Sequence, residues 1–197
     1  MKTQVKALVV GGGAIGTSIA YHLAKAGWDD VMLIERDELT SGSTWHAAGL
    51  LPLFNMSYSV GQLHKYSVDL YGRLEEETGQ DVGLRICSNI RLATNQDRMD
   101  EYMQYAGVAQ TIGVKVDFIT PEEVVEMWPF AVPDGLIGAM VHPDDGYVQP
   151  ADLTQAFAIG ARAGGGKIHR NTSVLSIEQL EDERWKVTTD KGTVIAE

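Results

Sequence analysis

The chain begins with the stretch Val5-Lys6-Ala7-Leu8-Val9-Val10-Gly11-Gly12-Gly13-Ala14-Ile15-Gly16, and this stretch decides the fold. Residues 5–10 are mostly apolar and β-branched, which predicts a strand buried on both faces of a parallel sheet. Apolar residues then recur at helical spacing over 14–25, and Gly27 supplies a stop signal for that helix. A second apolar run, 31–34, ends at Glu35. The order strand, helix, strand predicts a right-handed parallel crossover.

The glycines of this stretch have the spacing of a dinucleotide-binding turn. Gly11 permits a tight turn, Gly13 lets the backbone approach a pyrophosphate, and Gly16 lets the helix pack closely on the strand. The amides of Ala14 and Ile15 would face the phosphates at the positive end of the helix. Nineteen residues after Gly16, Glu35 is placed to accept hydrogen bonds from the adenosine ribose hydroxyls. This unit alone leaves the choice between NAD and FAD open.

Composition excludes several classes of protein. The chain has 197 residues, 44% of them hydrophobic, and a formal net charge of −11, which argues against binding to nucleic acid or to an anionic membrane surface. No apolar run approaches the roughly 18 residues of a spanning helix.

A single cysteine, Cys87, cannot form an internal disulfide and fits a reducing compartment; we expect it to be buried as a small apolar residue. We expect a cytoplasmic protein, or a processed mitochondrial matrix protein if it is eukaryotic, because a strand at residue 5 leaves no room for a targeting peptide.

The character of the sequence changes between about residues 51 and 149. This segment mixes short helices with hairpins, whereas the α/β pattern returns at Pro150. We therefore predict a first domain made of residues 1–50 and 150–197, interrupted by part of a second domain, 51–149. The predicted elements are a helix ending at Gly79, a hairpin of 82–87 and 89–94, a helix over 99–112, a strand over 116–119, a capping box at Thr120, a helix from Pro150, a strand over 167–177 and a hairpin of 185–189 and 193–196.

Several segments together carry a resemblance that separates FAD from NAD. They are the glycine turn, Glu35-Arg36, the stretch Leu39-Thr40-Ser41-Gly42-Ser43-Thr44-Trp45-His46-Ala47-Ala48-Gly49-Leu50, then 74–79, 90–94 and 145–150. With these residues the chain resembles the D-amino-acid-oxidase-like FAD superfamily, and within it the dimethylglycine and sarcosine dehydrogenase group. The likeness runs the full length of the chain. It implies an α/β fold: a Rossmann-like FAD-binding domain of the glutathione-reductase type with an inserted α+β substrate domain.

The same resemblance assigns roles to individual residues. It implies that His46 is joined covalently to the 8α-methyl carbon of FAD, that Arg36 flanks the adenosine, and that Val174 touches the adenine through its backbone. Two alternatives stay open: His46 packs on the flavin without a bond, and Val174 is ordinary strand core. The implied cofactor-binding residues are Gly11, Gly13, Ala14, Ile15, Gly16, Glu35, Arg36, Gly42, Ser43, Thr44, Trp45, His46, Ala47, Ala48, Gly49, Leu50 and Val174.

The resemblance also implies a reaction, the oxidative demethylation of an N-methylated glycine such as dimethylglycine. A hydride would pass from the N-methyl carbon to flavin N5, and electrons would leave to an electron-transfer flavoprotein or to oxygen. The iminium product would be hydrolysed to formaldehyde or captured by tetrahydrofolate. Alternatives are sarcosine or another secondary or tertiary amine as substrate, a non-catalytic regulatory relative of the kind that accompanies pyruvate dehydrogenase phosphatase, and an NAD-dependent dehydrogenase.

Family members continue beyond the position of Glu197 into the segments that hold their catalytic residues. We therefore expect no catalytic residue within these 197 residues and little or no activity from the chain alone. A metal site is not predicted, because His142, Asp144 and Asp145 match no ligand spacing and are typical of a turn.

Overall fold

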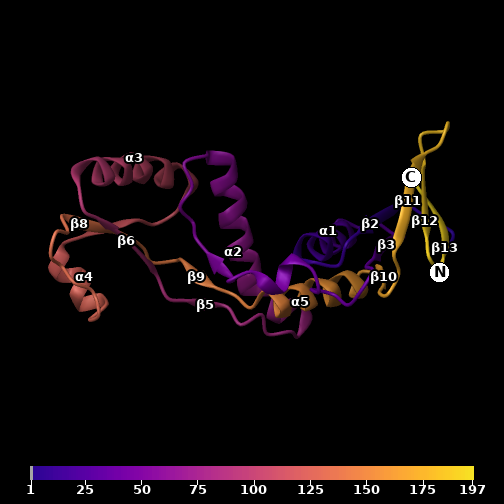
Figure 1. Ribbon diagram of the computed structural model, residues 1–197, viewed down its shortest axis with the longest axis horizontal. Helices are drawn as coiled ribbons and strands as arrows, with labels where there is room; N and C mark the ends of the chain where they lie inside the picture. The colour runs from indigo at the N-terminus through magenta and orange to yellow at the C-terminus, as the bar shows by residue number, and fades with distance from the viewer. Residues whose placement is uncertain (1) are drawn as a thin grey trace. The chain divides into compact units, whose positions relative to one another are not determined.

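The computed structural model describes residues 2–197 and divides the chain into two compact units. The first unit contains the residues up to Gly49 together with Arg73–Gly83 and Gln149–Glu197, and the second contains Leu50–Gly72 and Leu84–Val148. Figure 1 colours the chain by residue number, so that the segments of each unit can be followed along the ribbon. The segment 73–83 falls in the first unit by its contacts, although it lies inside the predicted insertion.

The first unit is built on the predicted crossover. Strands β2 (Ala7–Val10), β3 (Val31–Ile34) and β10 (Lys167–His169) form a parallel sheet in the order β10-β3-β2. Helix α1 (Ala14–Lys25) connects β2 to β3 and packs against α5 (Pro150–Ala163), which leads into β10. All four residues of β3 are buried, as expected for the central strand of a covered parallel sheet.

The predicted first strand is in fact two short strands. Residues Gln4–Val5 form β1, which pairs with the end of the chain, and only β2 joins the parallel sheet. The break falls at Lys6, where the amides of Lys6 and Ala7 both donate to the carbonyl oxygen of Asp30, at 3.2 and 3.4 Å. At these two hydrogen bonds the chain passes from the sheet that contains β1 to the parallel sheet that contains β2.

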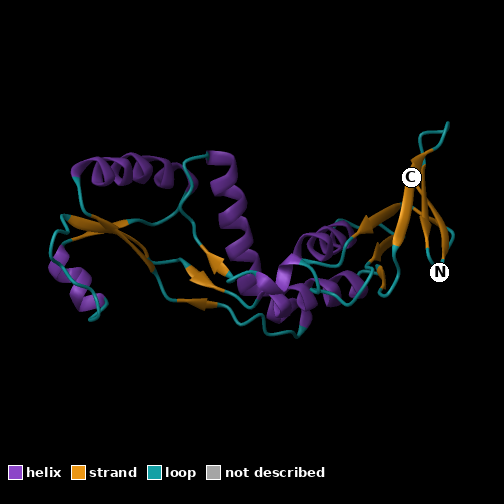
Figure 2. Ribbon diagram, viewed as in Figure 1, coloured by secondary structure: helices purple, strands orange, loops and turns teal. Residues whose placement is uncertain are grey.

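The predicted strand over 167–177 is likewise two strands, in two different sheets. After β10 the chain turns at Asn171, whose φ is +53°, and β11 (Val174–Gln179) begins a mixed sheet, in which β1 pairs in parallel and the other strands are antiparallel. The predicted hairpin is confirmed as β12 (Trp185–Thr189) and β13 (Gly192–Ala196) (Figure 2). Apolar side chains join this sheet to the parallel one in a shared core: Val5, Met32, Ile34, Val194 and Ala196.

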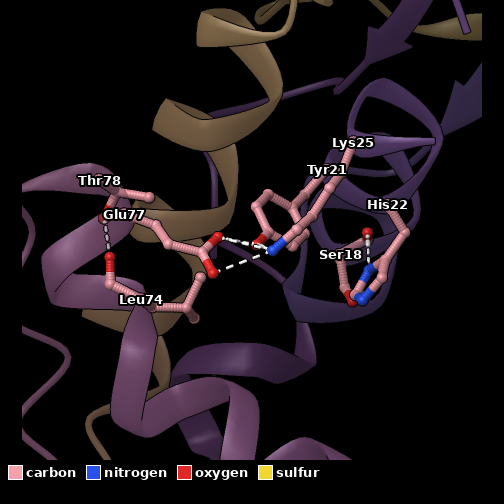
Figure 3. Close-up of polar contacts among 7 residues, drawn as sticks. All are labelled: Ser18, Tyr21, His22, Lys25, Leu74, Glu77 and Thr78. Atoms are coloured by element: carbon pink, nitrogen blue, oxygen red, sulfur yellow. Dashed lines mark hydrogen bonds and ion pairs between the residues drawn. The ribbon is translucent and has the colours of Figure 1, made fainter. Parts of the chain in front are cut away.

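The end of helix α2 (Tyr58–Thr78) is held against α1 within the first unit. The hydroxyl of Tyr21 donates to the Glu77 carboxylate, and the Lys25 ammonium lies 2.8 Å from both the tyrosine oxygen and a Glu77 oxygen (Figure 3). Tyr21 is 3% exposed, so the bonded hydroxyl stands at the edge of a buried ring. We call Tyr21, Lys25 and Glu77 the α1–α2 clamp.

The second unit has its own sheet and core. Strands β6 (Asn89–Ala93), β8 (Gly138–His142) and β7 (Asp117–Ile119) are antiparallel in the order β6-β8-β7, and α3 (Gln96–Ile112) packs its buried tyrosines and alanine against one face. Helix α3 ends at Gly113, where φ is +83°. The capping box at Thr120 is confirmed at the start of α4 (Pro121–Met127).

The predicted hairpin of 82–87 and 89–94 is wrong. Strand β5 (Arg85–Ile86) pairs with β9 (Gly146–Tyr147), which also pairs with β4 (Leu50–Leu51), whereas β6 pairs with β8. The amides of Cys87 and Ser88 both donate to the carbonyl oxygen of Asp145, so the chain leaves one sheet there instead of turning back on itself. Cys87 is exposed, contrary to expectation.

Candidate functional site

The glycine turn joins β2 to α1 by a close approach of backbone to backbone. Gly11 has a φ of +108°, a region that side chains disfavour, and its amide donates to the carbonyl oxygen of Ile34 at 2.8 Å. A Cβ added at Gly16 would lie 1.9 Å from the carbonyl oxygen of Gly11. The predicted need for glycine at both positions is therefore met by a specific geometry: the first turn of the helix touches the start of the turn that precedes it.

Glu35 follows β3 and reaches back to this turn. One of its carboxylate oxygens accepts from the Gly12 amide at 2.6 Å, and the other accepts from the Asp37 amide at 2.9 Å. A carboxylate oxygen has two lone pairs, so each can accept a further hydrogen bond from a ribose hydroxyl. The Glu35 carboxylate is thus held in place and can still accept hydrogen bonds from the ribose hydroxyls, as the sequence predicts.

Gly12 is a functional position that the sequence reasoning overlooked. A Cβ there would lie 2.9 Å from both Cβ and Cγ of Glu35, so a side chain at this position would displace the acidic residue. The available signal was the run of three glycines at 11–13, whose middle member the GxGxxG spacing leaves unassigned.

Thr44 connects two sequence features that lie thirty residues apart. Its hydroxyl oxygen accepts from the amide of Ala14, the first residue of α1, at 3.0 Å. Of the two amides predicted to face phosphates, that of Ala14 is therefore already bonded, whereas that of Ile15 has no protein acceptor among residues 2–197. The Thr44 hydroxyl has accepted one bond and can still donate its proton to a phosphate oxygen.

These elements enclose a cleft of about 580 Å³ within the first unit. It extends from the glycine turn and the start of α1, past Glu35 and Arg36, to the segment that begins at Ser41. Ser41, Ile19 and Pro150 were not predicted to take part. The residues that line the cleft are Val9, Val10, Gly11, Gly12, Gly13, Ala14, Ile15, Gly16, Ile19, Glu35, Arg36, Ser41, Gly42, Ser43, Thr44, Ala47 and Pro150.

Six predicted residues are not among those lining the cleft: Trp45, His46, Ala48, Gly49, Leu50 and Val174. Leu50 belongs to β4 in the second unit, and Val174 packs against the core between the two sheets of the first unit. The structure therefore brings together in one cleft the residues predicted to bind the adenosine and the phosphates. The flavin contacts predicted for Trp45, His46 and residues 48–50 stay predictions.

His46 ends a short 3₁₀ helix, η1 (Ser43–His46), and its ring has a defined hydrogen bond. Its Nδ1 lies 3.2 Å from the carbonyl oxygen of Gly42. A carbonyl oxygen can only accept, so Nδ1 is the donor, and in the neutral ring the lone pair is therefore on Nε2. The ring of Trp45, which is 61% exposed, lies against the histidine with 3.9 Å between the ring centroids.

The donor set of the cleft suits a dinucleotide. A helix N-terminus with a free amide at Ile15 and the hydroxyl of Thr44 can bind phosphate oxygens, and Glu35 can bind ribose. Residues 2–197 contain no group of three or more histidine, cysteine or acidic side chains arranged to bind a metal ion. Over the same residues, none of the helices has the length and apolar character needed to cross a membrane.

Known proteins are similar to this chain in sequence and, for one solved structure, in fold. The chain is 41% identical to mitochondrial dimethylglycine dehydrogenase of Rattus norvegicus over 99% of its length, and 39% identical to the formaldehyde-forming 4-methylaminobutanoate oxidase of Paenarthrobacter nicotinovorans over 98%. It covers 23% and 24% of those two proteins. The crystal structure of L-proline dehydrogenase from P. horikoshii superposes with a TM-score of 0.91 at 27% identity, over all of this chain and 52% of that one.

A family model described as FAD dependent oxidoreductase matches residues 6–197. The match includes the glycine turn, Glu35, residues 41–44 and Ala47, all of which line the cleft. The resemblance predicted from the sequence is confirmed at this level, and the chain belongs to the family of FAD dependent oxidoreductases.

Proposed function

We propose that this chain forms the FAD-binding part of an amine oxidoreductase that demethylates an N-methylated glycine. The observation that carries the proposal is the cleft in which the glycine turn, Glu35 and Thr44 converge, in a chain with 41% identity to dimethylglycine dehydrogenase. The chain spans less than a quarter of the length of that relative, so the activity is proposed for any longer protein that contains it.

The residues of the cleft have distinct tasks in this proposal. The Ile15 amide and the Thr44 hydroxyl bind the pyrophosphate, Glu35 binds the adenosine ribose, and Arg36 lies beside the adenosine. When bound, FAD would take up a hydride from the N-methyl carbon of the amine at flavin N5. The iminium left behind adds water and breaks down to formaldehyde and the demethylated amine, or is captured by tetrahydrofolate.

We keep His46 as the proposed point of covalent attachment. In the neutral ring, the hydrogen bond from Nδ1 to the Gly42 carbonyl leaves the lone pair on Nε2, so Nε2 is the nitrogen that can form the bond to the 8α carbon of the flavin. Expressed protein precipitated with acid should keep its yellow colour in the pellet, and the flavin-bearing peptide should include His46. His46→Ala should release the flavin into the supernatant, whereas His22→Ala, a histidine of α1 outside the cleft, should not.

Substrate turnover tests the reaction. Protein that contains this chain should lose its flavin absorbance band when dimethylglycine is added without oxygen, and should form one formaldehyde per two electrons transferred. Sarcosine and 4-methylaminobutanoate serve as competing substrates, because a preference for either changes the assigned amine. Protein that binds flavin but is bleached by none of these amines would support a non-catalytic relative, and protein that binds NAD without flavin would overturn the proposal.

The electron acceptor and the compartment belong to the same proposal. An electron-transfer flavoprotein or oxygen would accept the electrons, and oxygen consumption in the turnover assay separates the two. A mitochondrial matrix location follows for a eukaryotic protein from the similarity to the mitochondrial enzyme of the rat.

A further inference from the structure

The loop that carries Glu35 is held from outside the cleft by a second segment of the first unit. After β10, residues Arg170, Asn171 and Thr172 run beside residues 35–38 and bond to them at several points. The Thr172 amide donates to the Glu35 carbonyl oxygen at 2.9 Å, and the Asn171 amide donates to the Asp37 carbonyl oxygen at 3.1 Å. We call residues 170–172 the clasp.

Side chains of the clasp complete the contact. The Arg170 guanidinium pairs with the Glu38 carboxylate, and the side-chain amide of Asn171 donates to the other oxygen of Glu38 at 3.1 Å. Asn171 has a φ of +53°, a conformation that asparagine tolerates better than most residues. This turn directs the Asn171 backbone amide and side chain toward the same short stretch of the Glu35 loop.

The position of the Glu35 carboxylate depends on this loop. One of its oxygens is held by the Asp37 amide at 2.9 Å, and the carbonyl oxygen of the same Asp37 is held by the clasp. A shift of Asp37 would therefore move the donor that orients Glu35. The clasp itself lines no part of the cleft.

We infer that the clasp, through Glu38, is a positioning device that sets the Glu35 carboxylate for the adenosine ribose hydroxyls of the bound dinucleotide. The inference rests on the proposed function, because it assumes that the cleft binds the ADP half of FAD. Glu38 and Arg170 have side chains that are 59% and 51% exposed, and exposed ion pairs contribute little to folding stability. Their effect should therefore be seen in ligand recognition and not in unfolding.

ADP and 2′-deoxy-ADP are the probes, since they differ only in the hydroxyl that Glu35 is placed to bind. The full 197-residue chain carries His46→Ala throughout, so that flavin can be removed, and calorimetry gives both dissociation constants. This background should bind ADP about tenfold more tightly than 2′-deoxy-ADP, as expected for a hydrogen bond to a charged group. Glu35→Gln should reduce the ratio toward one.

Glu38→Ala should reduce the same ratio to less than about threefold, and in the presence of Glu35→Gln it should have no further effect. The matched control is Glu178→Ala, which removes another exposed glutamate of the first unit from an ion pair, with Lys186, and should keep the tenfold ratio. Both alanine variants should unfold within about 2 °C of the background.

A Glu38→Ala protein that keeps the tenfold ratio, or that weakens both ligands equally, would overturn the inference and leave the proposed function intact. A background protein that binds neither ADP nor FAD would overturn both. A background protein that binds ADP and 2′-deoxy-ADP equally would show that Glu35 does not bind the 2′-hydroxyl, and this result would also overturn the inference.

Discussion

At the scale of single residues, the glycine turn shows how one missing side chain decides a local structure. A Cβ at Gly16 would meet the Gly11 carbonyl oxygen at 1.9 Å, a distance that requires the backbone to move. Gly107, in the middle of α3, has open space where its Cβ would be. The two helical glycines therefore respond to the same substitution in opposite directions.

We predict that Gly16→Ala lowers the unfolding free energy by at least about 2 kcal/mol and abolishes FAD binding, because strain at the turn outweighs the better helix propensity of alanine. Gly107→Ala, its matched control, should raise the unfolding free energy by about 0.5–1 kcal/mol. Urea unfolding and flavin titration measure both. Equal effects of the two substitutions would show that the close approach at Gly16 does not exist in solution.

At the scale of elements, the α1–α2 clamp joins two helices far apart in sequence. Tyr21 donates to Glu77 and accepts from Lys25 across a partly buried edge (Figure 3). The bond from Lys25 and that from Tyr21 hold the pKa of Glu77 below its ordinary value of 4.5. A lowered carboxyl pKa means that the clamp stabilises the fold above about pH 4.5 and loses this effect as the pH falls.

Tyr21→Phe should therefore cost about 1 kcal/mol of unfolding free energy at pH 7, and the cost should shrink as the pH falls below 4.5. Tyr58→Phe is the control, because Tyr58 is 56% exposed on α2 and its loss should change the unfolding free energy by less than about 0.5 kcal/mol. Chemical unfolding at several pH values provides the measurement. A cost that does not depend on pH would mean that the ion pair and the tyrosine act separately.

Element prediction succeeded where local signals were sufficient. Helix α1, β3, the hairpin β12–β13 and the capping box at Thr120 follow from periodicity, turn residues and caps, which all act within a few residues. It failed for β5 and β6, because two adjacent apolar runs separated by a short turn are typical of a hairpin. Their actual partners, β9 and β8, lie about sixty and about fifty residues further on, and no local pattern encodes that choice.

At the scale of the whole molecule, the pH dependence of stability sums over every titrating group, and two buried groups of the second unit oppose one another. Burial raises the pKa of Asp145 to about 6 from its ordinary 3.8, an effect that Asp144 adds to and that the Leu53 amide, Arg91 and His64 reduce. Burial, assisted by Arg91, lowers the pKa of His142 to about 4 from 6.5. The two residues are 2% and 0% exposed.

The signs of the two effects differ. A raised carboxyl pKa stabilises the fold most below pH 3.8, and this contribution is lost as the pH rises through 6. A lowered histidine pKa stabilises the fold above pH 6.5, and this contribution is lost as the pH falls through 4. Each change corresponds to about 3 kcal/mol, so the two contributions nearly cancel between pH 4 and 6.

Asp145→Asn removes the opposing titration and leaves that of His142. Between pH 4 and 6, the unfolding free energy of the variant should therefore rise by about 3 kcal/mol more than that of the parent. Asparagine keeps an oxygen that can accept from the Leu53 amide, so the fold should be retained. Asp144→Asn, the same change at the exposed neighbour, removes only a minor contribution to the raised pKa of Asp145 and should alter the pH profile of the parent much less. Profiles that coincide for the parent and Asp145→Asn would contradict the assigned titration of Asp145.

The sequence by itself determined the cofactor class and the residues near the start of α1, because a phosphate-binding turn is encoded by neighbouring residues whose missing side chains and backbone amides act locally. Only the tertiary structure decided which distant residues meet there. Thr44 bonds to Ala14 across thirty positions, and the clasp at 170–172, which follows β10, bonds to the Glu35 loop, which follows the neighbouring strand β3. Such contacts depend on strand pairing and helix packing over the full chain, and these are set by the burial of whole elements and not by any one segment.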